Sequence, residues 1–392
     1  MRRRTRWALA FAAALSAAPA GADGEPAKIS DMADELQRIQ VRVAQGDKFA
    51  YSAQLAEIKA IGAAIAAAKP TTWTDKREAD SLVVYILSGG ALDDVIPLVK
   101  NDAMVESERA LVRGALAYIT NHETDALDAL SKIPLDTLDL RLAGQVAFAR
   151  SVLVTRRDPK AAVLLLDWAR LLAPGGLVEE AALRRETALL TEAREVSRVA
   201  TLTRQYATRF PTSLYAADFF RDLARLIGRI GLADDPANYQ LLSSAAATLP
   251  TDSRRDFLLT MAKAAIVNGR LSAASAAAAE ALRGAPPNSL EEARARLYLS
   301  AARIFTDAYD VALAALQSIA ASKLDRSDAA LLAAVRGAAA QLRMVPSAGA
   351  VQAQGASPEE GKADEAGVRI GQAEAALKRT ANIAAPSAGA PP

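Results

Sequence analysis

LVTRRDPKAAVLL, residues 153–165, contains the end of one helical segment, a polar turn and the start of a second helical segment. Arg156–Pro159 is polar and interrupts two apolar runs, and proline and glycine in this chain mostly occur between periodic segments, where helix ends belong. Three further stretches have the same order of features, namely residues 116–130, 265–274 and 304–313. This pattern predicts a series of antiparallel helical hairpins.

The hairpins recur at a nearly constant spacing. A small residue opens each second helix, and successive markers are 35 to 38 residues apart. The markers are Ala53, Ala91, Ala126, Ala161, Val199, Ala237, Ala274 and Ala312. Tetratricopeptide-type hairpins repeat about every 34 residues, and related α-solenoids have somewhat longer units. Val199 and Ala237 are placed partly by the spacing itself, so a less regular α-bundle of unrelated hairpins remains the alternative.

The composition favours the same fold class. Hydrophobic residues make up 51% of the chain but aromatic residues only 5%, and much of the apolar content is alanine, the best helix former. Leu82–Leu87 is the main β-branched run, and it fits a buried helix as well as a strand. We therefore predict an all-α protein with a solenoid of about eight degenerate tetratricopeptide-like units over residues 23–345.

The first residues have the pattern of a secretory signal peptide. Four arginines precede an uncharged run, Trp7–Ala18, which is too short to span a bilayer. Small residues then provide a cleavage site after Ala22, with Ala20 as the alternative. This pattern predicts that residues 1–22 are removed and that the mature protein works outside the cytoplasm, without membrane insertion.

Charge and residue types exclude several functions. The chain has 47 basic and 45 acidic residues; removing the four signal arginines leaves 43 against 45, a net charge of −2. Nucleic-acid binding usually needs a basic face, so none is expected. The chain has no cysteine and one histidine, which argues against thiol chemistry, most catalytic triads and most zinc sites. We expect no enzyme activity, cofactor or metal.

Several local motifs each allow a functional and a structural interpretation. His122 could be a lone general base but better fits a polar turn. Three acidic pairs could suggest a carboxylate dyad, but adjacent helical residues do not face each other, and two pairs near helix starts favour capping. The pairs are Asp93–Asp94, Glu179–Glu180 and Asp234–Asp235.

Two glycine pairs and two arginine pairs remain. Gly89–Gly90 and Gly175–Gly176 lack the other residues of a phosphate loop and are interpreted as turns. Arg184–Arg185 and Arg254–Arg255 are expected to be solvated or salt-bridged, with contact to an acidic partner as the alternative. No catalytic, cofactor-binding or metal-binding residue is predicted, and the partner-binding residues stay undetermined.

The C-terminal part of the chain has a different composition. Residues 346–392 are rich in Ala, Gly, Ser, Pro, Gln and Glu, and residues 361–382 could form one short helix. Such a composition buries too little apolar surface to fold alone. We therefore predict a flexible tail.

The centre of the chain resembles a known family. The segment Leu172–Glu186, LAPGGLVEEAALRRE, followed by Arg209–Tyr215, RFPTSLY, and then Phe219–Phe220, is similar to the central region of the MotC family of periplasmic motility proteins of rhizobia and related alpha-proteobacteria. The resemblance implies a non-enzymatic protein needed for flagellar rotation, which binds and stabilises the periplasmic part of the stator protein MotB. It implies no catalytic or cofactor residues.

Two other functions remain as alternatives. A general periplasmic helical-repeat scaffold for envelope protein assembly would rest on the predicted fold alone. Helical solenoids also occur beside the catalytic domain of lytic transglycosylases, but little sequence follows Met344.

Overall fold

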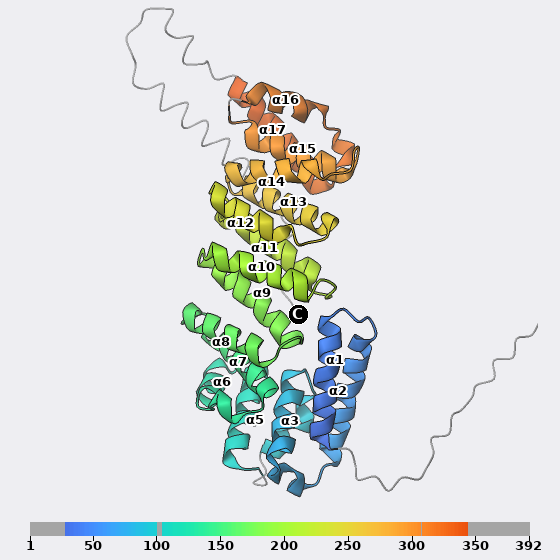
Figure 1. Ribbon diagram of the computed structural model, residues 1–392, viewed down its shortest axis with the longest axis vertical. Helices are drawn as coiled ribbons and strands as arrows, with labels where there is room; N and C mark the ends of the chain where they lie inside the picture. The colour runs from blue at the N-terminus through green and yellow to red at the C-terminus, as the bar shows by residue number, and fades with distance from the viewer. Residues whose placement is uncertain (1–27, 100–103, 307, 344–392) are drawn as a thin grey trace, which may run out of the picture.

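The computed structural model describes residues 28–99, 104–306 and 308–343, and these are all helical or connecting segments (Figure 1). Seventeen α-helices occur in the described residues, with no strand among them. They are α1 Ile29–Ala44, α2 Ala50–Ala67, α3 Lys76–Leu87, α4 Ile96–Val99, α5 Glu106–Ile119, α6 Glu123–Ser131, α7 Leu140–Val154, α8 Pro159–Leu172, α9 Leu177–Glu192, α10 Val196–Arg209, α11 Ala216–Ile230, α12 Pro236–Ala246, α13 Thr251–Val267, α14 Leu271–Arg283, α15 Leu290–Arg303, α16 Tyr309–Ser318 and α17 Arg326–Arg343.

Local sequence explains where several helices begin. Asp158 accepts a hydrogen bond from the Ala161 amide and is followed by proline at the first helical position of α8. Asp235 does the same for α12, accepting from the amides of Ala237 and Asn238. Both arrangements satisfy amide groups that the first turn of a helix leaves without partners. The prediction of an all-α fold is confirmed, and Leu82–Leu87 belongs to α3.

From α7 onward the helices form two layers (Figure 1). The odd-numbered helices α7, α9, α11, α13, α15 and α17 each contact the next odd helix, and α10, α12 and α14 do the same in the second layer. A large apolar core joins these layers, and it includes an aromatic group of Tyr206, Phe210, Phe219 and Phe220. The stacking buries the apolar face of each hairpin against its neighbours.

The eight-unit tetratricopeptide-like repeat is not confirmed. Seven of the eight predicted markers lie in the first four residues of an even-numbered helix, but Ala91 precedes a short 3₁₀-helix, Leu92–Asp94, and the four-residue α4 follows it. The α1–α2 hairpin also leaves the stack, since α1 contacts both α3 and the distant α9. The physical reason is that the N-terminal helix α1 packs against α9, in the middle of the chain.

The turn after α1 also contacts the loop between α10 and α11. Thr212, in the loop between α10 and α11, donates a 2.7 Å hydrogen bond from Oγ1 to the Gln45 carbonyl. Gly46 has φ +80°, and a Cβ atom there would lie 2.1 Å from the Thr212 carbonyl oxygen. Glycine is therefore needed at this position both for the backbone angle and for the close approach. The α1–α2 turn thereby supports the loop 210–215.

Candidate binding groove

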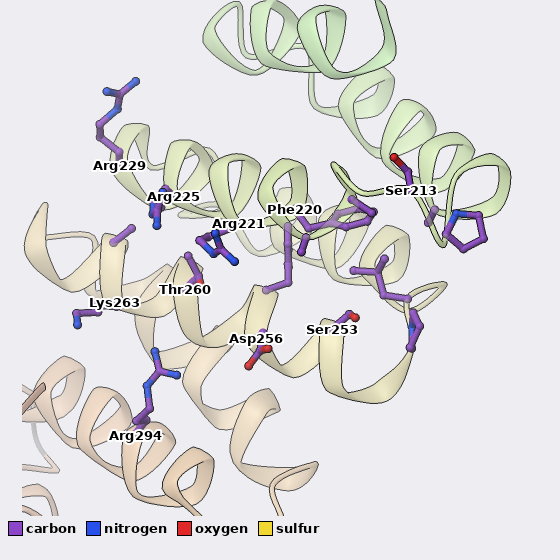
Figure 2. Close-up of a pocket in the computed structure, with 18 of the residues that line it drawn as sticks. Ser213, Phe220, Arg221, Arg225, Arg229, Ser253, Asp256, Thr260, Lys263 and Arg294 are labelled. Carbon is purple, nitrogen blue, oxygen red and sulfur yellow. The ribbon is translucent and has the colours of Figure 1, made fainter. Parts of the chain in front are cut away.

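A groove of about 850 Å³ opens along the layer of odd-numbered helices, between α11, α13, α15 and α17 (Figure 2). Its apolar lining includes Phe220 of α11, Phe257 of α13 and Leu331 of α17. The loop that Gln45 contacts forms one end, through Pro211, Thr212 and Ser213. This volume lies within the range of sites that bind small ligands.

One wall of the groove is a row of arginines. Arg221, Arg225 and Arg229 occupy every fourth position of α11, so they share one face of the helix. The opposite face is buried in the core through Phe219, Leu223 and Ile227, which explains why α11 presents the arginine face outward. Figure 2 shows Arg221 and Arg225 beside the groove and Arg229 at the far end of the row.

The ion pairs of these arginines are weak enough to be replaced by contacts with a ligand. Arg221 pairs with Asp218 at 2.6 Å and Arg225 with Asp222 at 2.9 Å, both three residues earlier on the same helix. All four side chains are about half or more exposed, and such exposed pairs contribute only about 0–1 kcal/mol. Arg229 forms no ion pair or hydrogen bond within the described residues. These guanidinium groups are therefore available to an incoming carboxylate.

The facing wall is held more firmly. The fully buried Asp328 of α17 accepts from Lys263 Nζ at 2.7 Å, from Arg294 Nε at 2.9 Å and from the Tyr298 hydroxyl at 2.6 Å. Burial of the phenol raises the pKa of Tyr298, so the hydroxyl remains a hydrogen-bond donor. One carboxylate thus fixes two cations, Lys263 and Arg294, at the groove.

The lining of the groove is basic overall. It contains five cations and one carboxylate, namely Arg221, Arg225, Arg229, Lys263, Arg294 and Asp256. Counting also the three carboxylates that pair with these cations gives five positive against four negative groups. The arrangement suits an extended anionic segment with some apolar side chains, because carboxylates bind guanidinium groups strongly and the floor is apolar.

The comparisons with known proteins identify the family. The profile of a family described as "Chemotaxis protein MotC" matches residues 1–390. The chain belongs to the MotC family. It is 29% identical over 357 residues to the Chemotaxis protein MotC of Rhizobium meliloti (strain 1021), which covers 90% of this chain and 80% of that protein. No solved structure matches the chain. The resemblance predicted from the central segment is thereby confirmed, and this is a motility-associated family.

The central segment that resembles the MotC family forms a buried polar network on α9. Glu179 is 2% exposed; it accepts from the Gly175 amide at 2.5 Å and pairs with Arg209 at 2.6 Å. Glu180 is fully buried and accepts from Tyr206 at 2.7 Å and from Ser213. The two adjacent carboxylates therefore have separate partners and form no dyad.

A third carboxylate on α9 completes this network. Glu186 is fully buried and pairs with Arg170 at 2.6 Å and with Arg198 at 2.9 Å. Burial raises the pKa of Glu186, and the two arginines oppose that effect. The network joins α8, α9 and α10, so its role in this MotC-family protein is to hold neighbouring hairpins together.

Three of the four residues in the other acidic pairs have structural partners as well. Asp94 accepts a hydrogen bond from the Tyr85 hydroxyl at 2.8 Å, and Asp235 caps α12 as described above. Asp234 lies 3.5 Å from Arg270. Asp93 is in the short 3₁₀-helix rather than at the start of an α-helix.

The remaining motifs lie in turns or on the surface. His122 precedes α6, is exposed, and its Nδ1 lies 2.9 Å from the Thr120 hydroxyl. Gly89 and Gly175 have positive φ and follow the helices α3 and α8. The predicted arginine pairs have partners within the chain: Arg184 stacks on Tyr215, Arg185 contacts Thr155, Arg254 pairs with Glu280, and Arg255 pairs with Asp252.

Some predictions fall outside the described residues, namely the signal peptide with its cleavage sites, the flexible tail over residues 346–392 and the helix at 361–382. Within the described part of the chain, no helix is long and apolar enough to cross a membrane. The same residues contain no cluster of His, Asp or Glu that could hold a metal ion. Sequence reasoning missed the arginine row of α11, although its spacing of four residues is visible in the sequence.

An apolar surface lies on α8, away from the groove. Leu164, Trp168 and Leu171 are 63%, 54% and 73% exposed and follow a spacing that places them on one helix face.

Proposed function

We propose that this protein is a non-enzymatic periplasmic component of the flagellar motor that binds and stabilises the periplasmic part of the stator protein MotB. The observation that supports it is membership of the MotC family over residues 1–390, together with similarity to a curated chemotaxis protein over 90% of the chain. The predicted signal peptide supports export to the periplasm.

The groove supplies the contact surface in this proposal. Helical stacks of this kind usually bind other proteins along an extended face. The groove joins an apolar floor to arginine, the residue type that is enriched at binding hot spots. An extended segment of MotB with acidic and apolar side chains would contact Arg221, Arg225 and Phe220.

A deletion strain tests the function. We expect loss of swimming with the motor assembled, and a lower level of MotB in the cell envelope. The intact gene should restore both, whereas a gene without codons 2–22 should restore neither because its product stays in the cytoplasm. Normal swimming with normal MotB levels in the deletion strain would contradict the proposal, and recovery by the leaderless gene would contradict the periplasmic location.

A further inference from the structure

The sequence that follows α17 contains a segment whose charge complements the groove. Four of the five acidic residues in residues 344–392 lie between positions 359 and 365, namely Glu359, Glu360, Asp364 and Glu365. Lys362 is the one base among them, so these seven residues have a net charge of −3. The interspersed residues are Gly361 and Ala363, which are small enough to lie close to a groove floor.

The position of α17 brings this segment within reach. Ser327 and Leu331 line the groove, and α17 ends twelve residues later at Arg343, about 18 Å along the helix axis. Fifteen residues separate Arg343 from Glu359. At about 3.3 Å per residue they can span at most roughly 50 Å, which exceeds the distance back to the groove.

The groove has arginine side chains that can bind the carboxylates of this segment. Arg229 has no ion pair in the described part of the chain, and the exposed pairs of Arg221 and Arg225 can be exchanged for tail carboxylates at little cost. A tethered segment also needs no second molecule to be present, so even a weak contact is populated.

We propose that the acidic segment Glu359–Glu365 binds to the arginine row of the groove in the same chain and competes there with the partner. The competition rests on the proposed function; the binding of the segment does not. In the free protein the segment covers Arg221 and Arg225, and the partner must displace it.

Spin-label distances in the full mature chain test the contact. The chain has no cysteine, so Ser253→Cys on the groove wall and Ala366→Cys beside the acidic segment give two unique labels. We expect a short, narrow distance population at low salt that disappears at high salt. The variant Glu359→Gln/Glu360→Gln/Asp364→Asn/Glu365→Gln should lose that population about tenfold, equivalent to ~1.4 kcal/mol.

A matched control removes charges of the opposite sign from the same tail. Lys378→Gln/Arg379→Gln should keep the short population, whereas Arg221→Ala/Arg225→Ala/Arg229→Ala should lose it while circular dichroism shows intact helices. Equal distance distributions in the wild type and the acid-neutralised variant would overturn the proposal.

Partner binding separates this inference from the proposed function. If the segment occupies the groove, the acid-neutralised variant should bind the periplasmic part of MotB about tenfold more tightly than the wild type, because a larger fraction of the groove is open. Docking of the tail without any MotB binding would contradict the proposed function alone. MotB binding with equal affinity in both variants would contradict the competition.

Discussion

The polar network of α9 and the arginine row of α11 are both dense in charge, yet they differ in how that charge is satisfied. Glu179, Glu180 and Glu186 are at most 2% exposed and have partners on neighbouring hairpins. Arg221 and Arg225 are 48% and 58% exposed, and their acidic partners lie one turn away on the same helix. The difference teaches that the buried charges hold the stack together, whereas the exposed ones remain free to bind.

The largest expected effect is loss of a buried carboxylate. Glu186→Ala leaves Arg170, which is 14% exposed, without its closest partner. Breaking a buried ion pair in this way costs about 3–5 kcal/mol. Urea unfolding should show a loss of about 3 kcal/mol in the free energy of unfolding. A loss below about 1 kcal/mol would mean that the network contributes little to stability.

Removal of one hydroxyl should have a smaller effect. Tyr206→Phe keeps the ring in its aromatic cluster but removes the donor to the fully buried Glu180. Leaving a buried acceptor with one partner fewer costs about 1–3 kcal/mol. Urea unfolding of this variant checks the value, and Tyr51→Phe, on an exposed tyrosine of α2, is the control without effect. Equal stability of wild type and Tyr206→Phe would show that Ser213 alone satisfies Glu180.

The pKa of Glu186 predicts a dependence of stability on pH. Burial raises the pKa of Glu186 in the folded protein above its ordinary value of 4.5. The folded state therefore takes up a proton before the unfolded state does, so lowering the pH from the folded pKa toward 4.5 adds stability. Glu186→Gln lacks this effect. As the pH is lowered over that range, the free energy of unfolding of the wild type should therefore rise relative to that of Glu186→Gln, which urea unfolding at several pH values measures.

Glu280 provides the matched control for this measurement. Burial alone would raise the pKa of Glu280, but hydrogen bonds from Tyr239, Ser243 and Arg254 outweigh it and hold the pKa below 4.5. Its contribution is lost only as the pH falls below that value, so Glu280→Gln should differ from wild type by a constant amount above pH 4.5. A constant difference for Glu186→Gln as well would contradict the account of the buried network.

The smallest effect on stability is expected in the groove. Arg221→Ala/Arg225→Ala/Arg229→Ala removes exposed side chains, and each surface substitution should change the free energy of unfolding by no more than about 0.5 kcal/mol. Arg38→Ala/Arg77→Ala/Arg113→Ala is a matched control, since these arginines also form exposed pairs with nearby acids. Urea unfolding should give similar curves for both triple variants. A loss of several kcal/mol in the groove variant would assign the arginine row to the fold.

Sequence reasoning reached the fold class and the family but not the site. Alanine content and periodicity were enough for an all-α stack, because each hairpin depends mainly on local sequence. The departure of the α1–α2 hairpin from the stack could not be foreseen, since that hairpin packs against residues about 170 positions later through Gln45 and Thr212. Similarly, Glu180 looked like one half of an acidic pair, and only folding shows that Tyr206 and Ser213 are its partners.

The arginine row illustrates the same limit. The spacing of Arg221, Arg225 and Arg229 predicts a shared helix face, but whether that face meets plain solvent or a groove depends on how α11 packs on α13. Lys263 and Arg294 lie at the same groove and share the buried Asp328 as a partner, which the sequence does not show.

The most direct test of the account is the affinity of the full mature chain for the purified periplasmic part of MotB, measured by calorimetry. We expect the wild type and the Arg38/Arg77/Arg113 control to bind equally well. The Arg221/Arg225/Arg229 variant should bind at least about tenfold more weakly, equivalent to ~1.4 kcal/mol. Trp168→Ala, on the exposed face of α8, should bind as the wild type does. Unchanged affinity in the groove variant, or loss of binding in Trp168→Ala instead, would contradict the assignment of the groove as the partner site.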